Sequence, residues 1–308
     1  MIKAGEHAVL EKAETCDTRR NTQPSKPTVH VADIEKGNNR DLPSILGRIG
    51  NLEVRLARNS SEIAAAQEVR FRVFYDELGA SRHYVHQLEN RDADRFDDFC
   101  DHLLVLDTSI HGPSRQQVVG TYRLMRQISA GSAGMFYSDQ EFALSALVGR
   151  HPGLRFLELG RSCVLSEYRT KRIVELLWQG IWAYCLHHRI DVMTGCASFQ
   201  GTIPAAHAEP LSFLAQSCRA EGQWDVKALP NRYFPMDLMP AEAIEVKRAL
   251  AGMPPLLKGY LRLGAKIGDG CVVDPDFDTV DVLVVLPVRE ISARYISHYG
   301  ADAARYTA

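Results

Sequence analysis

The segment Arg155-Phe156-Leu157-Glu158-Leu159-Gly160-Arg161-Ser162-Cys163-Val164-Leu165 (155–165) decides the fold of this chain. This short and mostly apolar run predicts a central β-strand, which Gly160 interrupts. Residues 172–189 follow with apolar side chains at helical spacing and predict a long helix, and residues 190–196 predict a further strand. Around this segment, helices are therefore expected to alternate with strands.

The chain before this segment adds strands that a loop, rather than a helix, connects. Residues 52–56 alternate apolar and polar positions, as a half-buried strand does, and a helix follows that ends at Gly79. Residues 102–107 and 118–125 predict two strands joined as a hairpin. Hairpin-linked strands together with alternating helices and strands predict a mixed α/β sheet.

The rest of the chain contains weaker helix and strand patterns. They predict a short helix around residues 138–147 within the connection 126–153, a short helix within 204–218, a helix over 242–250, an amphipathic run over 254–266 and an apolar strand over 280–286. Residues 1–50 are polar and aperiodic, which predicts a mostly disordered tail. We expect a core over residues 51–204, with residues 205–308 completing the same domain.

Composition narrows the class of protein. The 308 residues are 45% hydrophobic and 24% charged, as in globular proteins, and a net charge of -2 gives no basic field for nucleic acid. The seven cysteines are scattered, which predicts buried thiols in a reducing compartment and neither a metal site nor a disulfide framework. The start has no apolar signal region, and the longest apolar run near the end, Val282 to Leu286, cannot span a membrane. We expect a cytoplasmic protein, at most peripheral on the inner membrane.

Glu158 and Arg161 are the candidate catalytic residues of the central strand. On a regular strand they would point to opposite faces, because successive side chains alternate. A bulge at Gly160 would insert one residue and turn both side chains toward the same side. It would also free backbone N–H groups, which can stabilise a carbonyl oxygen as it becomes an oxyanion.

Two arginines on apolar elements need acidic partners. Arg70 falls on the apolar stripe of the first helix, and Arg123 lies in the middle of an apolar strand. An unpaired buried cation is costly, so Arg123 predicts a neighbour, either Glu158 or the pair Asp94 and Asp97. The alternatives are a snorkelling Arg70, a purely structural ion pair at Arg123 and a solvated acidic loop.

Residues 166–173 form a basic turn before the long helix. Arg169, Lys171 and Arg172 lie where a helix N-terminus offers N–H donors and a positive dipole to a phosphate group. The turn alone is weak evidence, because many such turns are polar. The chain contains no G-x-S-x-G, H-E-x-x-H or G-x-x-x-x-G-K-[ST] motif, which leaves the common hydrolase, zinc and nucleotide-hydrolysing classes without support.

Four motifs, in order over residues 70–161, resemble the branch of GNAT-like acyltransferases that contains the acyl-homoserine-lactone synthases and the ornithine N-acyltransferases. They are an Arg-x-x-x-Phe helix (Arg70, Phe74), an Asp-x-Phe-Asp loop (Asp94, Asp97), a strand arginine (Arg123) and a Glu-x-x-Arg strand (Glu158, Arg161). The resemblance implies a GNAT-like acyltransferase fold, here with a C-terminal extension.

The resemblance also implies roles. Glu158, Arg161 and Arg123 would be catalytic, with Glu158 the base that takes a proton from the attacking amine. The residues expected to bind the substrate are Arg70, Phe74, Asp94, Asp97 and Asp101.

Residues 101–105 and 254–260 look like the ornithine-lipid branch, whose members acylate the α-amine of ornithine. The autoinducer synthases are shorter, and they carry a tryptophan where this chain has Leu78-Gly79-Ala80. We therefore expect L-ornithine as the acceptor. Lys171-Arg172 stands where GNAT proteins usually have glycine, which favours a 3-hydroxyacyl group carried on the phosphopantetheine of acyl carrier protein over free coenzyme A, with no further cofactor.

A basic docking face is expected, because carrier proteins are acidic. Lys258, Arg262 and Lys266 recur at helical i, i+4, i+8 spacing, with apolar residues on the other side. The same face could lie on an anionic membrane or could simply be solvated.

Two other functions remain open from the sequence. The chain could be an autoinducer synthase with S-adenosylmethionine as acceptor. It could also be a non-catalytic module that binds acyl carrier protein, although such a module has no need of the clustered acidic and basic residues.

Overall fold

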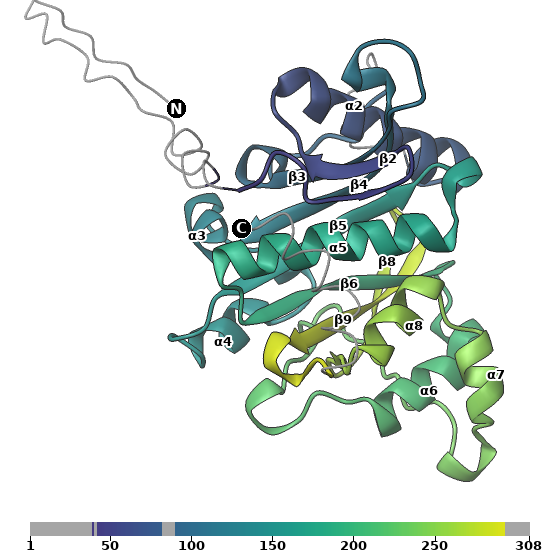
Figure 1. The fold of residues 1–308 in the computed structure, drawn as a ribbon. Coiled ribbons are helices and arrows are strands. Elements are labelled where there is room, and N and C mark those ends of the chain that lie inside the picture. Colours follow the sequence, from purple (N-terminus) through teal and green to yellow (C-terminus); the bar gives the residue numbers. More distant parts are fainter. Residues whose placement is uncertain (1–38, 40–41, 82–89, 293–308) are drawn as a thin grey trace, which may run out of the picture.

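The computed structural model describes residues 39, 42–81 and 90–292. Nine strands of these residues form a single sheet with the order β1-β2-β3-β4-β5-β6-β9-β7, and β8 pairs with β9 (Figure 1). The strands are β1 Gly47–Ile49, β2 Leu52–Leu56, β3 Asp101–Asp107, β4 Val118–Arg126, β5 Phe156–Val164, β6 Val192–Gln200, β7 Lys266–Ile267, β8 Val272–Asp274 and β9 Thr279–Pro287. The α-helices are α2 Ser60–Phe71, α3 Gln127–Ala133, α4 Leu144–Gly149, α5 Lys171–His188, α6 Ala208–Ser217, α7 Val246–Ala251 and α8 Pro255–Arg262.

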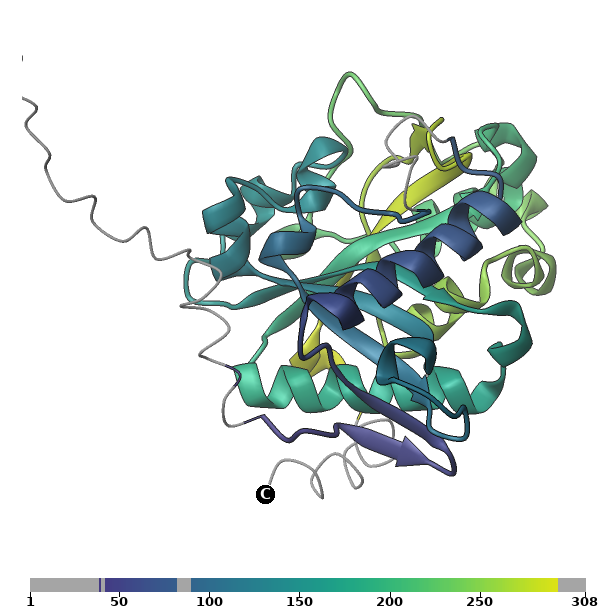
Figure 2. The same cartoon turned by 90° about the horizontal axis from the view of Figure 1, so that it is seen from above.

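Helices cover both faces of the sheet. The α2 and α5 helices lie on opposite faces (Figure 2), and α8 shares the face of α5, where Tyr260 packs edge-on against Trp178 with ring centroids 5.4 Å apart. The fit of α5 is close: a β-carbon at Gly180 would lie 2.7 Å from a methyl group of Val54 on β2. The apolar face of α5 and the centre of the sheet are thus one interdigitated core.

All neighbouring strands pair antiparallel except β5 and β6, which the α5 crossover makes parallel. This confirms the predicted mixed sheet. The β5–β6 pairing covers only the register from Phe156↔Val192 to Glu158↔Thr194, although both strands continue beyond it. The sheet therefore opens between β5 and β6 after Glu158.

Gly195 lies where the two strands separate. Its φ is +149°, and a β-carbon there would be 2.2 Å from the carbonyl oxygen of Leu159. Only glycine allows this approach, so the last contact between β5 and β6 depends on it.

The C-terminal third of the chain belongs to the sheet. β9 pairs with β6 along its whole length, from Val192↔Pro287 to Gln200↔Thr279. β9 is buried at every position, which agrees with the apolar strand predicted there. Residues 205–292 thus supply a strand, β9, that is paired along both of its edges.

Several elements differ from their predictions. The predicted tail overlaps β1, Gly47–Ile49, which pairs with β2; residues 1–38 and 40–41 lie outside the described residues. The connection 126–153 holds two α-helices, α3 and α4, rather than one, and the helix expected over 242–250 begins at Val246. Lys266 lies on β7 and not on α8, because the helix ends at Arg262. No helix within the described ranges is long and apolar enough to cross a membrane.

Candidate active site

A cavity of about 620 Å³ fills the opening between β5 and β6. It is lined by β5 from Glu158 to Ser162, by β6 from Cys196 to Gln200, and by residues from both faces of the sheet. Phe74 and Leu78 contribute from the α2 side, and residues 252–257 contribute from the start of α8. This cavity, the strand cavity, passes through the sheet, and most of its lining is apolar.

A second cavity of about 440 Å³ adjoins the first and has a different chemistry. The two share Tyr137, Arg161, Asp274 and Phe277 in their walls. The second cavity is lined by five carboxylates and three guanidinium groups, namely Asp92, Asp94, Glu141, Asp274 and Asp276 with Arg95, Arg161 and Arg232. This acidic cavity can bind a small molecule that carries more positive than negative charge.

Glu158 lies in the wall of the strand cavity and is 3% exposed. One carboxylate oxygen accepts the N–H of Tyr137 at 2.7 Å, and the other accepts the N–H of Ser138 at 2.8 Å and also the Ser138 hydroxyl. Burial raises the pKa of Glu158, although these hydrogen bonds oppose the rise. Glu158 thus holds the start of the 3₁₀ turn Tyr137–Gln140 against β5 while its carboxylate faces the cavity.

The predicted bulge is present on β5, but at Arg161 rather than Gly160. Arg123 faces Gly160 and Thr121 faces Cys163, so β5 has one more residue than β4 in this interval. Arg161 takes the left-handed conformation, with φ +50°. The distortion turns Arg161 into the cavities, where its side chain stacks between two aromatic rings.

The guanidinium group of Arg161 lies 4.7 Å from the ring centre of Tyr137 and 4.3 Å from that of Phe277. It forms ion pairs with Asp92 at 3.2 Å and with Asp94 at 3.5 Å. Arg161 therefore separates the two cavities and belongs to both.

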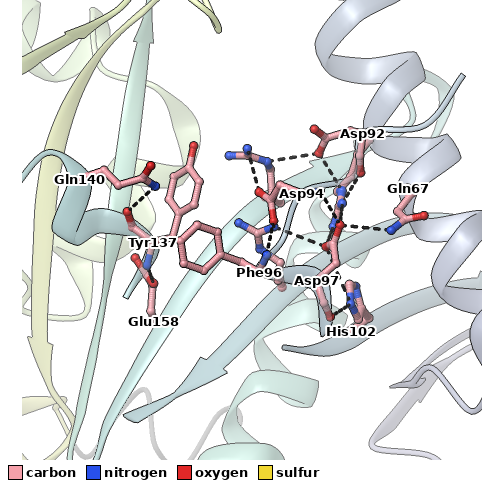
Figure 3. Close-up of polar contacts among 12 residues, drawn as sticks. Gln67, Asp92, Asp94, Phe96, Asp97, His102, Tyr137, Gln140 and Glu158 are labelled. Carbon is pink, nitrogen blue, oxygen red and sulfur yellow. Dashed lines mark hydrogen bonds and ion pairs between the residues drawn. The ribbon is translucent and has the colours of Figure 1, made fainter. Parts of the chain in front are cut away.

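The acidic loop pairs with the two arginines that the sequence singled out. Asp97 accepts hydrogen bonds from both terminal nitrogens of Arg70 at 2.8 Å, and Arg123 donates to Asp94 at 2.7 Å (Figure 3). Arg70 also pairs with Asp92 at 2.8 Å. Arg123 thus pairs with the acidic loop that carries Asp94 and Asp97, which was one of the two predicted alternatives.

This network is buried behind the cavity walls. Arg70, Arg123 and Asp97 are 1%, 3% and 6% exposed, and none of them lines either cavity. Burial opposes the ionisation of Asp97, but Arg70 outweighs it and lowers the pKa. Arg70 and Asp97 were expected to bind substrate and Arg123 to be catalytic. In the structure, the contacts of these three residues hold the loop that presents Asp92 and Asp94 to the acidic cavity.

Phe74 lies where the prediction placed it, on the wall of the strand cavity. It belongs to a π-helical turn, Arg72–Glu77, that continues α2. The wider turn shifts the stripe predicted to be buried, so that Leu78 is 40% exposed and faces the cavity instead of the core.

Asp101, which was expected to bind substrate, lines neither of the two cavities. It accepts hydrogen bonds from Tyr184 of α5 at 2.6 Å and from Asn39 at 2.9 Å. The next residue, His102, points to the other face, where its Nε2 lies 3.1 Å from the carbonyl oxygen of Asp97. Alternation along β3 therefore turns Asp101 away from the cavities.

The predicted donor-binding cations are dispersed. Arg169 is held by Glu77, with an N–O distance of 2.7 Å, and by the carbonyl oxygen of Val164. Lys171 and Arg172 are exposed at the start of α5, and within the described part of the chain they form no ion pair. Lys258 and Arg262 lie on α8, whose first turn borders the strand cavity.

Sequence reasoning missed several lining residues, above all Tyr137, Glu141, Asp274, Phe277 and Asp281. Asp281 did give a signal, because it is a charged residue within the apolar run of β9. Asp274 ends the short strand β8, which the sequence did not predict, and the others lie in connections whose course the sequence does not predict.

Comparisons with known proteins give the family of the chain. A family model described as the acetyltransferase (GNAT) domain matches residues 69–179, the part of the chain that supplies β3, β4, β5 and the first half of α5. Solved structures that resemble this one include FeeM, an N-acyl amino acid synthase from uncultured soil microbes (12% identity, 78% of this chain and 92% of that chain, TM-score 0.45). Another is the acyl-homoserine-lactone synthase LasI (11% identity, 81% and 95%, TM-score 0.43).

The fold and the opened sheet define this protein as an acyltransferase of the GNAT class. Among curated proteins, the L-ornithine N(alpha)-acyltransferase of Brucella abortus (strain 2308) is 62% identical over 262 residues, 85% of this chain and 93% of its own length. That of Rhizobium meliloti (strain 1021) is 58% identical over 276 residues, covering 90% and 93%. The chain belongs to the L-ornithine N(alpha)-acyltransferase family.

Proposed function

We propose that this protein transfers a 3-hydroxyacyl group from acyl carrier protein to the α-amino group of L-ornithine, giving lyso-ornithine lipid. The observation that carries the proposal is the pair of adjoining cavities, one mostly apolar and one acidic, which share the wall formed by Tyr137, Arg161, Asp274 and Phe277. The relatives named above act on ornithine by their names.

The acyl donor is assigned to the strand cavity. Beyond Glu158 the edge of β5 that faced β6 has no strand partner in the described part of the chain, so its backbone is available to the amide groups of a pantetheine arm. The apolar lining, with Phe74, Leu159 and Leu257, suits the acyl chain. The thioester carbonyl would then lie near the bulge at Arg161.

The acceptor is assigned to the acidic cavity. Ornithine carries two ammonium groups and one carboxylate near neutral pH, and this cavity has more carboxylates than guanidinium groups in its wall. Arg161, at the shared wall, is the cation placed to orient the substrate carboxylate.

In the proposed reaction the deprotonated α-amine attacks the thioester carbon. The new N–C bond forms, the C–S bond breaks and the pantetheine thiolate takes up a proton. Glu158 accepts the proton of the amine, and its burial supports this role because it raises the pKa of the carboxyl group toward neutrality.

Carrier docking is assigned to Lys258 and Arg262 on α8, whose first turn borders the strand cavity, together with the exposed Lys171 and Arg172 at the start of α5. Charge reversal at Arg262 tests the α8 face. Reduced affinity for acyl carrier protein supports carrier docking, whereas reduced binding to anionic liposomes supports peripheral membrane contact. If neither changes, the face is simply solvated.

Expression of this gene in a host without aminolipids, followed by mass spectrometry of the lipids, tests the reaction. Lyso-ornithine lipid with a 3-hydroxyacyl chain is the expected product. Acyl-homoserine lactone in the culture extract would contradict the proposal and support the autoinducer synthase, and the absence of both would support a non-catalytic module.

A further inference from the structure

Where the two cavities meet, a second acidic group lies apart from the Asp92–Asp94 loop. Glu141 lines the acidic cavity and Asp281 lines the strand cavity, and both are 6% exposed. A carboxylate oxygen from each and the sulfur of Cys196 all lie within 4.8 Å of one another. Glu141 comes from the connection before α4 and Asp281 from β9, so the fold brings them together from distant parts of the sequence.

Two polar side chains in the cluster around Glu141 and Asp281 have unused hydrogen-bonding capacity. Oδ1 of Asp281 is buried and has no hydrogen-bond partner among the residues that the structure describes. The same holds for the hydroxyl oxygen of Thr279, two residues earlier on β9, which also lines the strand cavity. The hydroxyls of Ser198 and Thr279 lie near enough to oppose a rise in the pKa of Asp281, yet neither meets hydrogen-bond geometry at Oδ1. An unpaired buried acceptor is costly, so these atoms indicate a missing donor.

The charge balance indicates that this donor is a cation. Arg232 forms an ion pair with Glu141 at 3.3 Å, while the nearby carboxylates of Asp281 and Asp274 add negative charge that Arg161 offsets only in part. Burial, together with the repulsion from Asp281 and Asp274, raises the pKa of Glu141 to about 7. Burial also raises the pKa of Asp281 to about 6. Without a further positive charge, these carboxylates hold a proton near neutral pH.

The geometry suits an ammonium group. Charge-assisted N–H···O bonds are about 2.8 Å long, so one nitrogen can bridge two oxygens up to roughly 5.6 Å apart. The oxygens of Glu141 and Asp281 lie within that limit. Cys196 acts here as a thiol that donates to Glu141 at 3.5 Å, since burial raises its pKa, and a thiol in this form does not bind a metal ion.

We propose that Glu141 and Asp281, assisted by Thr279, bind the side-chain ammonium group of the acceptor amino acid and thereby select a diamino acid. This inference rests on the proposed function, because it assigns one end of the acceptor. The Asp92–Asp94 loop and Arg161 bind the end of the acceptor that carries the α-amino and carboxylate groups. The Glu141–Asp281 pair binds the second amine, so an acceptor is selected by the spacing of its two amines.

The test compares L-ornithine with L-norvaline, which has the same carbon chain without the second amine. Steady-state rates are measured for the full-length protein with 3-hydroxyacyl carrier protein as donor, for the wild type and for Asp281→Asn, Glu141→Gln and the control Glu242→Gln, whose side chain is exposed in a distant turn. A hydrogen bond to a charged group is worth about 10- to 100-fold in affinity. The first two variants should therefore raise the KM for ornithine by about that factor and leave norvaline kinetics within about threefold, and Glu242→Gln should change neither.

Other results overturn the inference. A fall in kcat that is equal for both acceptors would make the pair a proton acceptor or a structural group, and activity that a chelator abolishes and a divalent ion restores would make it a metal site. Wild-type protein that acylates both amino acids equally well would remove the selectivity but leave the proposed acyl transfer standing. Wild-type protein that acylates neither would refute the proposed function and this inference with it.

Discussion

Replacement of Asp97 by asparagine tests whether the acidic loop is held by a buried ion-pair network. In the wild type, Asp97 receives two hydrogen bonds of 2.8 Å from Arg70, one of 3.1 Å from Gln67 and one of 3.4 Å from Arg123. Asparagine removes the charge and places an NH₂ group against these donors. Arg70 and Arg123 then remain buried with less compensation.

Loss of one partner of a buried ion pair costs roughly 3–5 kcal/mol. Arg70 keeps its ion pair with Asp92, so we expect a value near the lower end, about 3 kcal/mol. For a domain of this size that corresponds to a fall in Tm of roughly 6–12 °C. Urea denaturation at pH 7 measures the loss directly. The control is Asp98→Asn, one residue along and exposed, for which we expect a change within about 0.5 kcal/mol.

The pH dependence supplies an independent check. The folded pKa of Asp97 lies below its ordinary value of 3.8, so its contribution to stability is complete above that value and is lost as the pH falls through the folded pKa. The stability difference between wild type and Asp97→Asn should therefore be constant near neutrality and shrink at strongly acidic pH. A loss below about 1 kcal/mol at pH 7 would refute the claim that this network holds the loop.

Three further predictions concern the opened sheet and a remote ion pair. Glu158→Gln should lower kcat at least about 100-fold, since general-base catalysis contributes that much, and should remove the acidic limb of the pH–rate profile; unchanged turnover would exclude Glu158 as the base. Gly195→Ala should destabilise the protein by about 2 kcal/mol or more and reduce acyl transfer, because its β-carbon would meet the carbonyl oxygen of Leu159 at 2.2 Å; thermal unfolding at the wild-type temperature would contradict this. Arg55→Met should reduce stability by roughly 3–5 kcal/mol through the loss of its buried ion pair with Glu62 (2.7 Å), with the KM for ornithine unchanged in protein that remains folded; a raised KM would show that this pair communicates with the site.

The sequence predicted the elements whose signals are local. The apolar period of α5 and the interrupted strand at Glu158 and Arg161 were recognisable, and so was the need of Arg123 for an acidic partner, because burial of a lone charge is costly whatever the fold. Which acidic residue pairs with Arg123 could not be decided from the sequence, since Glu158 and the Asp94–Asp97 pair could both lie beside an arginine in the middle of a strand. In the structure Arg123 pairs with Asp94, while Glu158 accepts hydrogen bonds from the backbone of Tyr137 and Ser138.

Other features depend on tertiary structure alone. Asp101 and His102 are neighbours in sequence but serve opposite faces of the sheet, and the sequence did not show which face would be the site. The bulge was predicted at Gly160 but lies at Arg161. Its position is set by the register between β5 and β4, not by the tolerance of glycine for unusual backbone angles. Glu141 gave no signal because Asp281, which lies close to it in the structure, is on the last strand.

The most direct test of the account is the product made in vitro. Purified full-length protein is incubated with 3-hydroxyacyl carrier protein and L-ornithine, and tandem mass spectrometry locates the amide bond. The account predicts a single amide on the α-nitrogen, with the side-chain amine free. An amide on the side-chain nitrogen, or no acylated ornithine in the presence of intact donor, would contradict it.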